Sequence, residues 1–188
     1  MSGGNMSKKV DFDFLPQWAK RWEFWEIIES KCTKHNINPY YIAALIKTES
    51  DGNPLACRYE KNFKWTYDTA DFAKSLRSSE DTIEMMQKTS WGLCQVMGTV
   101  FFELGGNLEP LYEYRWPTSM LDKRISIEYG CRYWNSKAKY YHDPMQIYAA
   151  YNAGTVRYSI DCPENLINQA NVDRYEANLK DLTKCTRY

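Results

Sequence analysis

The chain has 188 residues, of which 44% are hydrophobic and 26% charged, and its 24 Lys and Arg residues balance 24 Asp and Glu residues. This length can bury one sizeable core, and no apolar run is long enough to span a bilayer. The zero net charge gives no general attraction to nucleic acid or to an anionic membrane surface, so we expect neither as a partner.

The first residues lack the apolar stretch and the small-residue cleavage site of a secretory signal. We therefore interpret residues 1–15 as a flexible N-terminal segment and residues 16–188 as a single domain, which we expect to be monomeric. The six cysteines include no CxxC pair, and we expect them to be reduced thiols. His35 and His142 are isolated and lack metal-ligand spacing, so we expect no metal and no cofactor.

Apolar spacing and capping signals predict a series of helices. In chain order, these cover 16–34 after Pro16, 39–50 between Asn38 and Gly52, Ser78 or Ser79 to about Lys88, a short helix capped by Thr99 and ended by Gly105-Gly106, one from Asp122, one from Asp143-Pro144 to Gly154, and one around 172–182. Residues 53–77 show no clear period, which predicts a loop-rich insertion with at most a small β-hairpin. The fold class predicted is mainly α.

Aromatic residues are in excess, with 15 Tyr and 7 Trp. Trp18, Trp22 and Trp25 recur at helical spacing, which predicts that they fill the core. We expect most other aromatic rings to do the same, and the remainder can stack on the apolar faces of sugars.

Glu49 is the most informative charged residue. Ile42, Leu45, Ile46 and Glu49 follow helical spacing, which places this carboxylate on the apolar stripe. Apolar surroundings and the negative end of the helix dipole both raise the pKa of a carboxyl group, which favours a general acid for glycosidic bond cleavage. The alternative, that Glu49 lies at the helix end and reaches water, stays open on periodicity alone.

Three sequence blocks decide between these interpretations. Glu49-Ser50-Asp51-Gly52-Asn53-Pro54, Ser90-Trp91-Gly92-Leu93-Cys94-Gln95-Val96-Met97 and Ala150-Tyr151-Asn152-Ala153-Gly154 resemble, in order, the blocks of the soluble lytic transglycosylase family. The resemblance spans about residues 38–155. It implies a lysozyme-like helical domain that acts on the glycan strands of bacterial peptidoglycan.

The resemblance also implies roles for single residues. They are Glu49 as catalytic acid and base, Ser50 beside it, Gln95 as a hydrogen-bonding partner of the substrate, Met97 in the substrate-binding set, Tyr151 as the hydroxyl that holds the catalytic carboxyl, and Asn152 as a contact near the cleaved bond. Each also has a structural interpretation. Gln95 can be a helix-surface amide, Tyr151 a core ring, and Asn152 part of a helix C-terminal signal.

The sequence departs from the family pattern in two places. Cys94 replaces the Met that is usual before Gln95, a small apolar change from which we expect no loss of activity. The spacing of about 45 residues between Glu49 and Gln95 is longer than is common in the family. The insertion carries three acids that could serve as a second carboxylate: Glu60, Asp68 and Asp71.

These acids separate two mechanisms. A lytic transglycosylase needs one carboxylate and forms a 1,6-anhydro end on N-acetylmuramic acid, whereas inverting hydrolysis, as in the similar goose-type lysozymes, needs a second carboxylate to activate water. We favour the one-carboxylate route and expect each insertion acid to be solvated or ion-paired. A component that binds glycan without turnover is a third alternative.

The expected partner is therefore peptidoglycan. The absence of a visible signal sequence favours delivery as a phage endolysin or a virion-associated enzyme.

Overall fold

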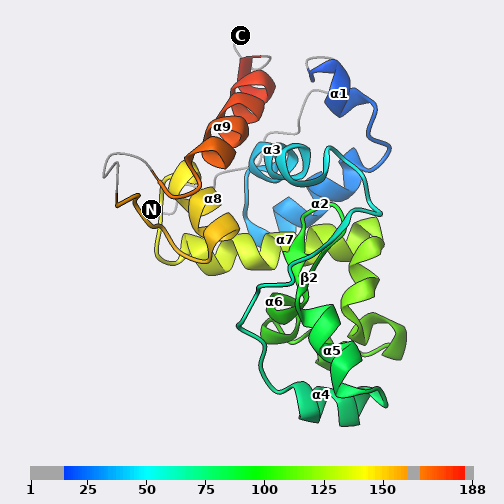
Figure 1. Cartoon of the computed structure of the whole chain (residues 1–188). Helices are drawn as coiled ribbons and strands as arrows, with labels where there is room; N and C mark the ends of the chain where they lie inside the picture. The colour runs from blue at the N-terminus through cyan, green and yellow to red at the C-terminus, as the bar shows by residue number, and fades with distance from the viewer. Residues whose placement is uncertain (1–14, 161–165, 185–188) are drawn as a thin grey trace, which may run out of the picture. The chain divides into compact units, whose positions relative to one another are not determined.

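A computed structural model describes residues 15–160 and 166–184 of the chain. This part is mainly helical and contains a small three-stranded antiparallel sheet, which confirms the predicted fold class (Figure 1). The chain divides into two compact units, residues 1–48 with 134–188 and residues 49–133. No described helix is long and apolar enough to cross a membrane.

Helices form the first unit, residues 1–48 with 134–188. They are α1 (Gln17–Lys20), α2 (Trp25–His35), α3 (Pro39–Ser50) up to Thr48, α7 (Lys123–Ala138) from Trp134, α8 (Pro144–Ala153) and α9 (Gln169–Lys184). The predicted helices 39–50 and 144–153 are confirmed, and so is the last helix. Their capping residues act as expected, because Asn38 Oδ1 accepts from Tyr40 N at 3.0 Å and Asp143 Oδ1 accepts from Met145 N at 3.2 Å.

The prediction of one continuous helix over 16–34 is wrong, because α1 ends at Lys20 and α2 begins at Trp25. The rings of Trp22 and Phe24 stack with centroids 5.2 Å apart. Residues two apart on a helix point to different sides, so this stack requires the break. Trp25 is buried as predicted, whereas Trp18 and Trp22 are half-buried.

The second unit, residues 49–133, contains the sheet and shorter helices. Its elements are the end of α3, β1 (Cys57–Tyr59), α4 (Thr69–Leu76), α5 (Glu80–Gln87), β2 (Thr89–Trp91), β3 (Val96–Met97), α6 (Gly98–Glu103), the 3-10 helices η2 (Gly106–Leu108), η3 (Tyr112–Arg115) and η4 (Pro117–Leu121), and the start of α7. α4 packs against α5, and α5 against α6. The predicted cap of α5 is confirmed, because Ser79 Oγ accepts from Thr82 N at 3.2 Å.

The prediction that Thr99 caps a helix is wrong. α6 begins at Gly98, with Met97 as its N-cap, so Thr99 lies inside the helix. A side chain at Gly98 would meet the Met86 carbonyl oxygen at 2.0 Å, which shows how closely the start of α6 approaches α5. The buried Thr99 hydroxyl instead donates to the Trp65 carbonyl at 3.0 Å and fixes the insertion.

The sheet has the order β1-β2-β3, and both pairs are antiparallel. β1 lies in the 53–77 insertion. Its partner strand, β2, lies outside the insertion, which the sequence did not predict. Cys57 pairs with Trp91, and Tyr59 pairs with Thr89. The insertion also contains the helix α4, so it is less irregular than predicted.

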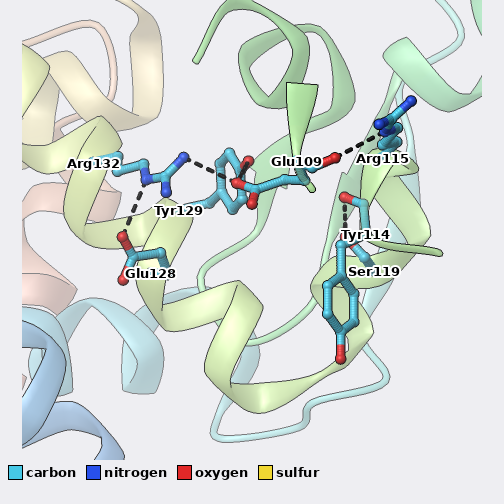
Figure 2. Close-up of polar contacts among 7 residues, drawn as sticks. All are labelled: Glu109, Tyr114, Arg115, Ser119, Glu128, Tyr129 and Arg132. Atoms are coloured by element: carbon cyan, nitrogen blue, oxygen red, sulfur yellow. Dashed lines mark hydrogen bonds and ion pairs between the residues drawn. The ribbon is translucent and has the colours of Figure 1, made fainter. Parts of the chain in front are cut away.

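A polar cluster connects the stretch after α6 to α7 (Figure 2). Glu109 Oε1 accepts from Tyr129 Oη at 2.7 Å and from Arg132 Nη1 at 3.3 Å, and Arg132 Nε donates to Glu128 at 3.1 Å. The Glu109 carbonyl accepts from Arg115 Nε at 2.8 Å. Burial, followed by the hydrogen bond to Glu109, raises the pKa of Tyr129 and keeps its phenol protonated. The cluster therefore fixes a segment that has little regular structure of its own.

Candidate active site

The second sequence block forms a tight turn in the unit of residues 49–133. Trp91 pairs with Val96, so Gly92–Gln95 connects β2 to β3. Leu93 and Cys94 are fully buried, whereas Gln95 is half-buried. We call these four residues the Gly92–Gln95 turn.

Gly92 is required at the start of this turn for two reasons. Its φ of +69° lies in the left-handed region, which side chains disfavour. A Cβ at this position would also lie 1.9 Å from the Met120 carbonyl oxygen and 2.7 Å from Ser126 Oγ. The backbone of the turn is thus in direct contact with η4 and α7. A residue larger than glycine at this position would prevent that contact.

Two hydroxyl groups hold the middle of the turn. Ser50 Oγ, at the end of α3, donates to the Leu93 carbonyl at 2.8 Å. Ser126 Oγ, on α7, accepts from the Cys94 N–H at 3.2 Å in a fully buried position. Ser50 was predicted as part of the site, but Ser126 was missed. A lone serine in a helix carries no sequence signal for such a role, which depends on the approach of Gly92.

Gln95 ends the turn in an unusual backbone conformation, with φ of +47°. Its Nε2 donates to the carbonyl oxygens of Ala56 at 3.0 Å and Gly92 at 2.9 Å. Because both acceptors are carbonyls, the amide nitrogen must face them, which leaves Oε1 as the group that can accept from a ligand. Gln95 lies on this turn and not on a helix surface, so that structural interpretation is wrong.

Glu49 lies one residue before Ser50 at the end of α3. Glu49 is half-buried, and the three apolar residues of its predicted stripe, Ile42, Leu45 and Ile46, are fully buried. Burial raises the pKa of the Cys94 thiol well above its usual value, and neighbouring Cys131 raises it further, whereas the Ser126 hydrogen bond lowers it. The charge of Glu49 also raises the pKa of this thiol. The Glu49 carboxyl is therefore close enough to the Gly92–Gln95 turn to act on it electrostatically.

Met97 follows the turn on β3 and is half-buried. Its sulfur accepts from Ser90 Oγ at 3.1 Å, across the β2–β3 pair. In the described part of the chain, no group of three or more His, Cys, Asp or Glu residues could hold a metal ion.

The comparisons with known proteins identify a family for this arrangement. A family model described as Transglycosylase SLT domain matches residues 26–161, well over half of the chain. The chain belongs to this family. It matches no curated protein and no solved structure. Membership of the transglycosylase family implies lytic transglycosylase action on peptidoglycan and therefore on the bacterial cell wall.

The insertion acids of this SLT domain are placed in solvent or in an ion pair. Glu60 forms an ion pair of 2.5 Å with Arg58, and both are exposed enough to reach water. Asp68 precedes α4 as its N-cap residue, Asp71 lies in its first turn, and both are exposed.

The third block of the SLT domain lies on α8, in the other unit. Tyr151 is buried, and Asn152 is half-buried near the end of the helix. Asn152 Oδ1 accepts from the amide groups of Asn168 and Asn171, each at 3.1 Å. It thereby holds the start of α9, a structural role beside the predicted one. The substrate roles of Tyr151 and Asn152 stay predictions.

Four described cysteines, Cys32, Cys57, Cys94 and Cys131, are not joined in disulfides. Cys162, Cys185 and all but the last residue of the predicted N-terminal segment lie outside the described residues.

Proposed function

We propose that this SLT domain cleaves the bond between N-acetylmuramic acid and N-acetylglucosamine by the one-carboxylate route, with Glu49 as acid and then base. The hydrogen bond from Ser50 Oγ to the Leu93 carbonyl, 2.8 Å long, carries the proposal. It joins the end of the helix that bears Glu49 to the turn that bears Gln95. The acid and the amide thus belong to one hydrogen-bonded arrangement.

In the proposed reaction, the Glu49 carboxylic acid gives its proton to the glycosidic oxygen as the bond from that oxygen to the sugar carbon C1 breaks. The 2-acetamido group stabilises the resulting cation. The Glu49 carboxylate then takes the proton of the C6 hydroxyl, and O6 bonds to C1 and closes the 1,6-anhydro ring. Glu49 ends protonated, as it began.

Gln95 is proposed to position the substrate through one defined atom. Its amide nitrogen donates to the carbonyl oxygens of Ala56 and Gly92, so Oε1 remains to accept from a sugar hydroxyl or acetamido N–H. The left-handed backbone of Gln95 fits such a role, because strained conformations are concentrated at functional sites.

The state of the insertion acids supports the lyase route over hydrolysis. Inverting hydrolysis needs a second carboxylate about 6.5–9.5 Å from the first to activate water. Glu60 is neutralised by Arg58, and Asp68 and Asp71 are exposed at the start of a separate helix. Each therefore has a structural explanation that needs no catalytic role.

The test is digestion of purified cell-wall sacculi by the wild type, Glu49→Gln and Glu60→Gln. We expect Glu49→Gln to release at least about 1,000-fold less soluble muropeptide, since it cannot transfer a proton. Glu60→Gln is the matched control and should retain activity. Equal release by wild type and Glu49→Gln would overturn the proposal and favour a different catalytic group. No release by any of them would favour a component that binds glycan without turnover.

Mass spectrometry of the products separates the two chemistries. Anhydro ends are lighter than reducing ends by one water, so anhydro ends support the lyase route. Reducing ends, together with loss of activity in Glu60→Gln, Asp68→Asn or Asp71→Asn, would show goose-type hydrolysis instead.

A further inference from the structure

The insertion contains a surface that the proposed catalytic residues do not use. From the last residue of β1 to Trp65 it carries three aromatic residues, Tyr59, Phe63 and Trp65, interleaved with Lys61 and Lys64. Tyr59 is 54% exposed and Trp65 70% exposed, although both are large and partly apolar. We call these five residues the aromatic-lysine segment.

The backbone of this segment is held in place in spite of its irregular structure. Glu60 N donates to the Lys88 carbonyl at 2.8 Å, and the buried Thr99 hydroxyl donates to the Trp65 carbonyl at 3.0 Å. The fully buried Gln87 side chain bonds both the N–H and the carbonyl of Tyr67, at 3.0 and 2.9 Å. Buried polar side chains therefore fix the main chain while the Tyr59 and Trp65 side chains stay largely exposed to water.

Two rings of the segment form an ordered pair, in which Phe63 is half-buried and Trp65 is exposed. Phe63 and Trp65 contact each other edge to face, with centroids 5.7 Å apart. A ring pair that is pre-positioned in this way loses little conformational freedom when a ligand stacks on it. Large aromatic rings are normally removed from water by burial in the core. A cluster of them left on the surface is therefore typical of a binding site.

The charge of the segment adds a second requirement on the ligand. Lys61 and Lys64 are exposed, and within the described residues neither ammonium group pairs with a carboxylate. A ligand with apolar sugar faces and carboxylate groups fits both features. Peptidoglycan strands have both, because their sugars carry, through lactyl groups, stem peptides that bear carboxylates.

The segment continues directly from the candidate active site. The Ala56 carbonyl accepts from Gly92 N and from Gln95 Nε2, at 2.8 and 3.0 Å, and β1 starts at the next residue. A strand rises by about 3.3 Å per residue, so Tyr59 lies about 10 Å along β1 from Ala56. Figure 1 shows the chain between this sheet and α4 as a long coil on the same unit.

We propose that the aromatic-lysine segment is a binding subsite for a peptide-bearing glycan strand, with Phe63 and Trp65 stacking on sugar rings and Lys61 and Lys64 binding stem-peptide carboxylates. The proposal rests on the proposed function for its substrate class. It assigns to the long insertion the task of holding the strand beside the bond that is cut.

The test measures binding separately from cleavage. Binding is measured to intact sacculi and to sacculi whose stem-peptide carboxyl groups have been amidated. The proteins are Glu49→Gln alone and Glu49→Gln combined with Trp65→Ala, or with Lys61→Ala and Lys64→Ala together. Leu108→Ala, at a position 77% exposed in the same unit, is the apolar control, and the exposed Lys74→Ala is the cationic control. Melting temperatures show that each variant folds.

We expect Trp65→Ala to weaken binding to both materials about fivefold, the size of a typical aromatic contact. The double lysine variant should weaken binding about threefold on intact sacculi and not on amidated sacculi, and the difference should vanish at high salt. Binding equal to the parent in both variants would overturn the proposal. An equal loss in the Leu108 control would do so as well.

Cleavage assays distinguish failure of the subsite from failure of the proposed function. In these assays Trp65→Ala is made in protein that keeps Glu49. If the subsite is correct, Trp65→Ala raises KM and leaves kcat unchanged. If only the subsite is wrong, Glu49→Gln remains inactive while Trp65→Ala matches the wild type. If only the catalytic proposal is wrong, Glu49→Gln is active while the binding losses persist.

Discussion

The Gly92–Gln95 turn and the aromatic-lysine segment are joined through Ala56 and β1, yet the chain builds them in opposite ways. In the turn, Leu93 and Cys94 are fully buried, and hydrogen bonds from α3 and α7 hold the backbone. In the segment the backbone is held, but four of the five side chains are exposed and Phe63 is half-buried. The turn therefore cannot change without disturbing the unit, whereas the segment can change its ligand contacts at little cost in stability.

The largest effect is expected at Gly92. Gly92→Ala forces a left-handed backbone and a clash with the Met120 carbonyl, which we expect to cost roughly 3 kcal/mol or more of unfolding free energy. Gly105→Ala is the matched control, because Gly105 has a φ of +83° but no atom within 4 Å of its Cβ position. It should cost about 1 kcal/mol. Urea unfolding measures both, and equal losses would contradict the close approach.

The next effect concerns Ser126. Ser126→Ala leaves the buried Cys94 N–H without its acceptor, which should lower the unfolding free energy by about 1–3 kcal/mol. If Ser126 positions the turn, kcat on sacculi should also fall in Ser126→Ala. This is measured at a temperature well below the melting temperature of the variant, where the protein is folded. Ser119→Ala removes an exposed hydrogen bond of 3.4 Å (Figure 2) and should change stability by less than about 0.5 kcal/mol. Unchanged kcat in Ser126→Ala would limit its role to stability.

The buried Cys94 thiol predicts a dependence on alkaline pH. Burial raises its pKa in the folded state, so above the ordinary value of 9.0 the unfolded chain loses a proton that the folded chain keeps. Stability should thus be complete below pH 9 and fall as the pH rises toward the folded pKa, by up to about 1.4 kcal/mol per pH unit from this group. Buried tyrosines shift in the same direction, so the measurement is the difference between wild type and Cys94→Ala in urea unfolding at several pH values. Identical slopes would contradict the prediction.

The smallest effect is expected in the segment. Trp65→Ala should change the unfolding free energy by less than about 0.5 kcal/mol, since the ring is 70% exposed and the hydrogen bond from Thr99 goes to the main chain. The buried Phe101→Ala is the contrasting control and should cost about 3–5 kcal/mol. A large loss in Trp65→Ala would mean that the segment is structural, and would remove the contrast with the turn.

Much of the helical pattern could be predicted because helix ends have local causes. Asn38, Ser79 and Asp143 carry side chains that accept from the first backbone N–H groups, and each begins a helix where expected. The failures come from contacts between distant residues. Trp22 stacks on Phe24 and interrupts a regular apolar period, and Gly98 starts α6 ahead of Thr99 because it packs closely on α5.

The sequence by itself determined the mainly helical class, most helix boundaries and the family, because these depend on local spacing and on short blocks of chemistry. Only the tertiary structure decided that β1 pairs with a strand outside the insertion and that Ser126 completes the turn. Each of these depends on hydrogen bonds whose geometry is set by packing, and packing has no fixed separation along the chain.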